Sequence, residues 1–65
     1  MMISYEPLFT TLEEKGAKLI DLMNAGIVSS RTMAKFRKGE SVQLTTIERI
    51  CKYLDVPIER VVRIE

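Results

Sequence analysis

The segment Leu22–Gly39, which reads LMNAGIVSSRTMAKFRKG, is the most informative part of this 65-residue chain. It contains the end of one short helix, a turn at Gly26 and a second helix with basic residues on its free face. Glycine enters the left-handed backbone region of such a turn without steric cost, and Ser29 supplies the oxygen that caps a following helix. The segment therefore predicts a helix over Ser30–Lys38, joined by a tight turn to the helix before it.

The rest of the chain has the spacing of short amphipathic helices, so the expected fold is all-α. Ser4 is a candidate cap for the first helix, and Pro7 is tolerated in that helix's first turn. The other helices are expected at about Glu6–Lys15, at about Leu19–Ala25, from a cap at Thr45 or Thr46 to Leu54, and, as a short fifth helix, after Pro57. These helices make one compact five-helix domain over residues 1–65.

Apolar residues recur along each expected helix at spacings of three and four, which is the pattern of one buried stripe. The stripes comprise Tyr5, Leu8, Phe9 and Leu12, then Leu22 and Met23, then Met33 and Phe36, then Ile47, Ile50, Cys51 and Leu54, and finally Ile58, Val61 and Val62. Cys51 is expected to be a buried thiol that packs as a small apolar group, because the chain has no histidine to activate it.

Composition argues against several classes of protein. One cysteine excludes an internal disulfide, and the lack of histidine removes the commonest metal ligand and general base. We therefore expect that the protein binds no metal and no other cofactor and that it is not an enzyme. The adjacent carboxylates Glu13 and Glu14 point to diverging faces of a helix. The chain has no apolar run of about 18 residues and no secretory signal, which predicts a cytoplasmic protein without a membrane partner.

The net charge of +1 is small, but the charge is unevenly distributed. Residues 27–43 contain four basic residues and one acidic residue, a local charge of +3, which leaves 1 − 3 = −2 for the remaining 48 residues. A basic segment on a mildly acidic scaffold orients a protein on a polyanion and restrains indiscriminate binding. The distribution is that expected of a protein that binds DNA with one surface.

The basic helix has side chains suited to the major groove of DNA. Arg31, near the helix start, matches the O6 and N7 acceptors of guanine, and Lys35, one turn later, reaches the next bases or a phosphate. Ala34 is small enough to let the helix settle in the groove and contact a thymine methyl. Ser29 and Ser30 offer hydroxyls and amides at a helix N-terminus, where an anion such as phosphate is favoured.

A less specific interpretation is that these charges only solvate the outer face of a helix. The glycine turn, the serine cap and the order of the helices together favour DNA binding over that interpretation.

The segments DLMNAGIVSSRTMAKFRKGES and TIERICKYLDVPIERVV resemble the lambda-repressor-like helix-turn-helix family of the Xre/Cro type, in particular its small single-domain members. The resemblance covers nearly the whole chain and implies a five-helix DNA-binding regulator of transcription without enzymatic activity. On the family's pattern, Ser29 is the cap, and the base-reading positions are Ser30, Arg31 and Lys35. Positions that approach phosphate are matched by Thr32, Lys38 and Gln43.

The chain departs from that pattern at the start of the second helix. The family usually has a capping serine or threonine and a polar phosphate-binding residue there, and this chain has Lys18 and Leu19 instead. Leu19 and Ile20 therefore belong either to the core or to a contact surface for another chain.

A homodimer on a palindromic operator is the expected state, because a single recognition helix contacts only a few base pairs. A two-fold axis places two such helices about 34 Å apart, one turn of DNA. Candidate interface segments are the C-terminal helix with its VVRIE tail and the N-terminal residues Met2–Tyr5, whose β-branched residues also allow a short strand pairing between Ile3 and Ile64. No small-molecule effector is evident from the sequence, and the simplest function is that of a repressor.

The alternative function is a protein-interaction module, such as a co-regulator or an antagonist, that uses the same fold without reading DNA. The modest net charge and the apolar pair Leu19 and Ile20 favour it. RNA binding ranks lower, because the exposed side of the basic helix lacks the aromatic residues on which unpaired bases stack.

Overall fold

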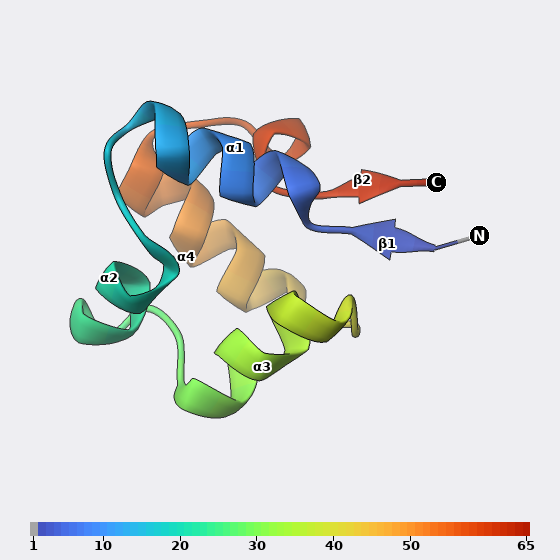
Figure 1. The fold of residues 1–65 in the computed structure, drawn as a ribbon, viewed down its shortest axis with the longest axis horizontal. Helices are drawn as coiled ribbons and strands as arrows, with labels where there is room; N and C mark the ends of the chain where they lie inside the picture. Colours follow the sequence, from blue (N-terminus) through green and yellow to red (C-terminus); the bar gives the residue numbers. More distant parts are fainter. Residues whose placement is uncertain (1) are drawn as a thin grey trace.

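The computed structural model describes residues 2–65, and most of them are helical (Figure 1). Along these residues the elements are β1 (Ile3–Ser4), α1 (Glu6–Glu14), α2 (Leu19–Asn24), α3 (Ser30–Lys38), α4 (Leu44–Leu54), the 3-10 helix η1 (Ile58–Arg60) and β2 (Arg63–Ile64). The predicted helical fold is confirmed, with two differences: the fifth helix is a single 3-10 turn, and the two ends of the chain form a short ribbon.

The ribbon is an antiparallel pair in which Ile3 lies opposite Ile64 and Ser4 lies opposite Arg63. Beyond it, Met2 and Glu65 exchange two backbone hydrogen bonds of 2.7 Å. The pairing between Ile3 and Ile64 that the sequence allowed is therefore present, and it forms within one chain. As a result, β1 and β2 project together from the helical body (Figure 1).

The buried stripe of α1 differs at one position from the prediction. Leu8 and Leu12 are buried, but Phe9 is exposed, so its assignment to the core was wrong. Thr11 takes a buried place instead, and its hydroxyl donates a 2.6 Å hydrogen bond to the carbonyl of Arg60. The cap also differs: Tyr5 occupies the N-cap position, while the Ser4 hydroxyl accepts a 3.3 Å hydrogen bond from the amide of Glu6.

The beginning of α4 is earlier than the sequence predicted. Gln43 is the N-cap residue and Leu44 begins the helix, so neither Thr45 nor Thr46 caps it. The helix ends at Asp55, whose φ of 56° is in the left-handed region. After it, Val61 is fully buried, whereas Ile58, predicted to close the core, is 47% exposed.

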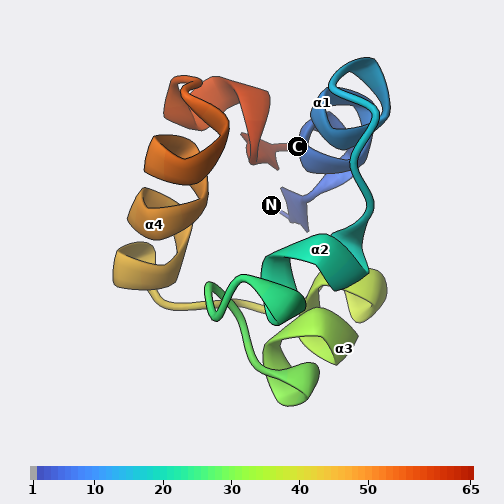
Figure 2. The ribbon, with the colours of Figure 1, turned by 90° about the vertical axis from the view of Figure 1, so that its left-hand side faces the viewer.

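The core fills the space between α1, α4 and the pair α2 and α3. Figure 2 shows α1 and α4 on opposite sides, with α2 and α3 across the lower end. The largest fully buried apolar side chains come from these elements and from the segment after η1, and they are Phe36, Leu8, Leu22, Ile50 and Val61. No helix among residues 2–65 has the length and apolar character needed to cross a membrane.

Candidate nucleic-acid interface

The turn between α2 and α3 fixes the two helices relative to each other. Gly26 follows the end of α2 with a φ of 77°, and the amide of Ile27 donates a 2.9 Å hydrogen bond to the carbonyl of Leu22. This bond satisfies a carbonyl that the helix end would otherwise leave unpaired, and it needs the left-handed conformation that glycine adopts. Val28 is buried directly after it, so the turn is anchored to the core.

The N-terminus of α3 is capped as predicted. Ser29 is the N-cap residue, and its hydroxyl oxygen accepts a 3.2 Å hydrogen bond from the amide of Thr32. The two hydroxyls also lie 3.1 Å apart. Ser30 and Arg31 follow in the first turn with exposed side chains, so this turn offers donors to an incoming ligand.

The C-terminal end of α3 is held by α1 and the N-terminal segment. The rings of Tyr5 and Phe36 meet edge to face with their centroids 4.7 Å apart. The Tyr5 hydroxyl donates a 2.6 Å hydrogen bond to the carbonyl of Glu40, just after Gly39 ends the helix in the left-handed conformation. Both ends of α3 are therefore fixed by specific contacts, which leaves its outer face rigidly presented.

The outer face of α3 carries the predicted basic residues. Arg31, Arg37 and Lys38 are exposed and Lys35 is half-buried, while Met33 and Phe36 on the inner face are buried. Ala34, between Arg31 and Lys35 on the helix surface, is exposed as well. The ion pairs found among residues 2–65 lie on α1, η1, α4 and the chain ends, and none involves a basic residue of α3.

A small polar notch adjoins α3 where the chain passes into α4. It has a volume of about 230 Å³ and is lined by Thr32, Lys35, Val42, Gln43 and Thr46. Three predicted site residues therefore meet here, although Gln43 lies outside α3. Thr46 was not among the predicted site residues, because its position suggested a helix cap instead.

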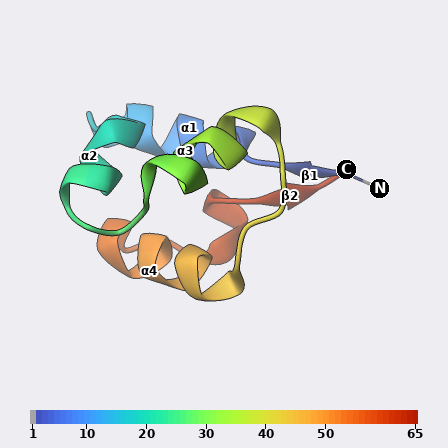
Figure 3. The same ribbon diagram turned by 90° about the horizontal axis from the view of Figure 1, so that it is seen from below.

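The predicted site residues thus lie along α3 and just beyond it. Ser29, Ser30 and Arg31 lie at the N-terminal end of α3, Thr32 and Lys35 border the notch with Gln43, and Lys38 lies at the C-terminal end. Viewed from below, α3 and the start of α4 lie on the side of the molecule that faces the reader (Figure 3). The arrangement is a convex, cationic helix face with a polar notch beside it, the shape and charge that a groove of DNA accepts.

The start of α2 shows how the helix begins without a serine or threonine cap and where Leu19 and Ile20 lie. The carboxylate of Asp21 accepts a 2.8 Å hydrogen bond from the amide of Lys18, the N-cap residue, so Asp21 holds the helix start from the third helical position although the N-cap hydroxyl is missing. Leu19 is buried and belongs to the core, whereas Ile20 is 41% exposed.

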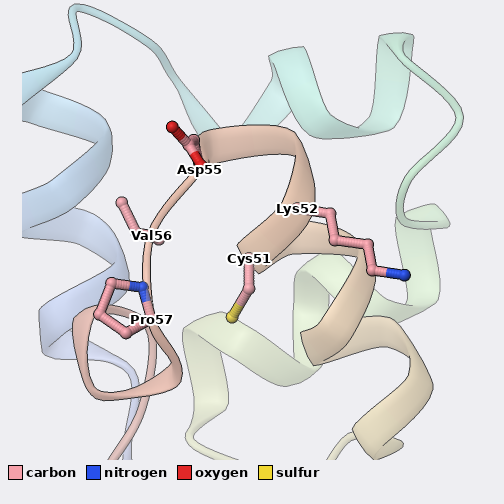
Figure 4. Close-up of a pocket in the computed structure, with 5 residues that line it drawn as sticks. All are labelled: Cys51, Lys52, Asp55, Val56 and Pro57. Carbon is pink, nitrogen blue, oxygen red and sulfur yellow. The ribbon is translucent and has the colours of Figure 1, made fainter.

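Another hollow, of about 350 Å³, is lined by Cys51, Lys52, Asp55, Val56 and Pro57 (Figure 4). Cys51 is half-buried, not fully buried as predicted, and burial raises the pKa of its thiol. The side chains of Cys51 and Lys52 point in different directions from α4 (Figure 4), so they do not converge on one ligand. Within residues 2–65, no three cysteine or acidic side chains gather closely enough to hold a metal ion.

The sequence and the structure of this chain are both similar to those of known proteins. The family model of the Cro/C1-type helix-turn-helix DNA-binding domain matches residues 10–64, which include α2, the turn and α3. The structure is similar to the crystal structure of the transcriptional regulator VanUg, with a TM-score of 0.90 and 34% sequence identity over 95% of this chain and 83% of that one. No curated protein sequence matches the chain.

Proposed function

This chain belongs to the Cro/C1-type helix-turn-helix DNA-binding family, and from that premise we propose that it is a sequence-specific transcriptional regulator that acts as a repressor. The observation that carries the proposal is the outer face of α3, where a helix fixed at both ends presents basic side chains that form no ion pair with any of residues 2–65. The likeness to a protein described as a transcriptional regulator supports it.

Base recognition is assigned to the N-terminal half of α3. Arg31 donates two hydrogen bonds to the O6 and N7 of a guanine, because its planar guanidinium matches that pair of acceptors. Ser30 and Lys35 contact neighbouring base edges, and Ala34 lies against a thymine methyl. These exposed or half-buried side chains follow one another along the face that enters the groove.

Phosphate contacts are assigned to the residues around that face. Ser29 and Thr32 approach one backbone strand at the N-terminus of α3, where the partial positive charge of the helix favours an anion. Gln43, at the N-terminus of α4, and Lys38, at the end of α3, approach the DNA backbone beside the notch. Such contacts set the register of the protein on DNA but do not read the sequence.

The binding unit is proposed to be a homodimer on a palindromic operator. A single domain of 65 residues buries too little DNA surface to select one site among many competitors. Two copies related by a two-fold axis place two α3 helices about 34 Å apart in successive major grooves. Occupancy of such an operator by the dimer is the simplest way to block transcription.

The test is selection of bound fragments from randomised duplex DNA, together with the mass of the complex in solution. We expect a palindromic consensus and a complex with two copies of the chain. A consensus without two-fold symmetry, or a complex with one copy, would contradict the dimeric operator. Failure to enrich any sequence would contradict sequence-specific reading.

A second candidate is a protein-interaction module that does not read DNA, which the exposed Ile20 on α2 favours. Binding to mixed duplex DNA at about 50 mM salt separates the two candidates, since electrostatic affinity is greatest at low salt. Binding there supports the regulator. No binding there, with a partner protein retained by the wild type and lost by Ile20→Asp, supports the module.

A further inference from the structure

A groove beside the ribbon is lined almost entirely by apolar side chains. It has a volume of about 260 Å³ and lies between β1, β2, η1 and the beginning of α4. We call it the ribbon groove and define it by Ile3, Val42, Leu44, Ile58, Val62 and Ile64. The other residues that line it, Tyr5 and Ile47, are buried, and none of the lining residues is charged.

The rim of the ribbon groove exposes large apolar side chains to solvent. Leu44 is 74% exposed, Ile64 is 59% exposed and Ile58 is 47% exposed. Exposed apolar side chains that are scattered singly are ordinary, whereas these three surround one apolar hollow and form a candidate contact surface. Leu44 is informative because it is the first residue of α4 and contributes little to the core.

We propose that a second copy of this chain occupies the ribbon groove, so that the grooves of two copies face each other across the two-fold axis of the dimer. The inference rests on the proposed function, to which it adds the location of the interface. In a two-fold contact the same patch is used by both copies, so the patch must be complementary to itself. An uncharged apolar surface meets that condition, and it offers no counter-charge to an acidic or basic partner.

The position of the groove relative to α3 supports this occupant. In Figure 1, α3 lies along the lower edge of the molecule while the ribbon projects to one side, and Figure 3 shows the ribbon beside α3 when the molecule is seen from below. A two-fold axis next to the ribbon, along the viewing direction of Figure 3, therefore leaves the α3 helices of both copies on one face. That is the arrangement that two half-sites on one face of DNA require.

The groove is also continuous with the DNA-facing surface. Val42 lines both the ribbon groove and the polar notch that contains Lys35 and Gln43. A copy seated in the groove thus lies next to the residues assigned to DNA contact. Binding of adjacent half-sites therefore brings the two grooves together, and the dimer contact in turn favours occupation of both half-sites.

The exposed area indicates how strong the contact is. A fully exposed large aliphatic side chain offers roughly 60–120 Å² of apolar surface, so the three rim residues offer on the order of 200 Å² per copy. A stable interface buries about 800 Å² per partner. The ribbon groove therefore supports a weak dimer, which dissociates on dilution and forms fully on the operator.

The experiment compares Leu44→Asp and Ile64→Asp with the wild type by sedimentation equilibrium over a wide concentration range. The matched control is Tyr53→Asp, which places the same charge at an exposed aromatic residue of α4 outside the groove. We expect the wild type and Tyr53→Asp to dimerise with similar concentration dependence, and both groove variants to need at least about 10-fold more protein. Unfolding by urea checks that all variants are folded.

DNA binding by the same variants separates this proposal from the proposed function. On a duplex with one half-site, we expect the groove variants to bind as the wild type does, and on a palindromic duplex to lose the cooperative second step. Folded groove variants that dimerise like the wild type would overturn the interface while leaving DNA reading intact. If the wild type bound neither the half-site duplex nor the palindromic duplex at about 50 mM salt, the proposed function would be overturned instead.

Discussion

The outer face of α3 and the ribbon groove adjoin at Val42 but have opposite chemistry. The first carries basic side chains that are not ion-paired within the described part of the chain, and the residues that line the second are uncharged. A charged surface binds a polyanion with a strength that falls as salt rises, whereas an apolar contact does not weaken in this way. DNA binding and self-association of this chain should therefore be separable by salt and by single substitutions.

Substitution on the inner face of α3, which supports both surfaces, should lower the free energy of unfolding more than any other change considered below. Phe36→Ala should lower the free energy of unfolding by about 3–5 kcal/mol, because a buried ring in contact with Tyr5 is replaced by a cavity. Urea denaturation measures this loss. Arg37→Ala, at the adjacent exposed position, should change stability by less than about 0.5 kcal/mol. Equal losses in the two variants would show that α3 is not anchored through Phe36.

Salt should weaken DNA binding by the outer face of α3 much more than dimerisation through the ribbon groove. For about four phosphate contacts, raising salt from about 50 to about 200 mM should weaken the binding of one copy to a single half-site on the order of 100-fold. The concentration dependence of dimerisation without DNA should be nearly unchanged over the same range. Fluorescence anisotropy and sedimentation measure the two quantities. Dimerisation that weakened in parallel with DNA binding would mean that charged residues, not the ribbon groove, hold the copies together.

Within the basic face, base reading and phosphate contact should differ. Arg31→Ala should cost about 1–3 kcal/mol of binding free energy at one operator position and relax the preference there. Lys38→Ala should weaken binding to all sequences alike and lower the salt slope by about one unit. Titrations of operator and mixed DNA distinguish them. If Arg31→Ala weakened binding equally on both DNAs, Arg31 would be a phosphate contact.

Tyr5 links the two surfaces, since it lines the ribbon groove and holds the end of α3. Tyr5→Phe keeps the ring and removes the hydrogen bond to Glu40, so stability should fall by about 0.5–1.5 kcal/mol, as measured by urea denaturation at neutral pH. Burial of the Tyr5 hydroxyl raises its pKa above the ordinary value of 10.0.

The sign of the pH dependence follows from that raised pKa. A raised folded-state pKa means that the stabilisation is complete below about pH 10 and is lost as pH rises through the folded-state pKa. Tyr5→Phe should therefore remove part of the alkaline loss of stability. An unchanged alkaline profile would show that Tyr5 does not contribute to it.

Much of this structure follows from local sequence rules. The bounds of α3 were predictable because Ser29 and Gly39 mark its ends with chemistry that few other residues provide. Positions governed by tertiary packing were not predictable. Phe9 fits the periodic stripe of α1 but is exposed, because the face of α1 that meets the rest of the molecule is centred on Leu8 and includes Thr11 on the flank away from Phe9.

The outer face of α3 and the ribbon groove also differ in how far the sequence predicts them. The exposed basic residues of α3 followed from helical spacing, since Met33 and Phe36 set which side is inner. The notch beside Lys35 and the ribbon groove depend on how segments far apart in the chain meet, such as Ile3 with Ile64. The resemblance predicted Gln43 as a site residue. Its position as the N-cap of α4 was not predictable, because Thr45 and Thr46 have better capping side chains than Gln43.

Amide chemical-shift mapping by NMR, while a selected duplex is added, shows whether the outer face of α3 contacts duplex DNA. We predict that the largest changes fall on residues 29–38 and on Gln43, with smaller changes at the ribbon groove if the duplex is palindromic. Changes confined to other exposed positions, such as Phe9, Ile20 and Tyr53, with α3 unaffected, would contradict the account.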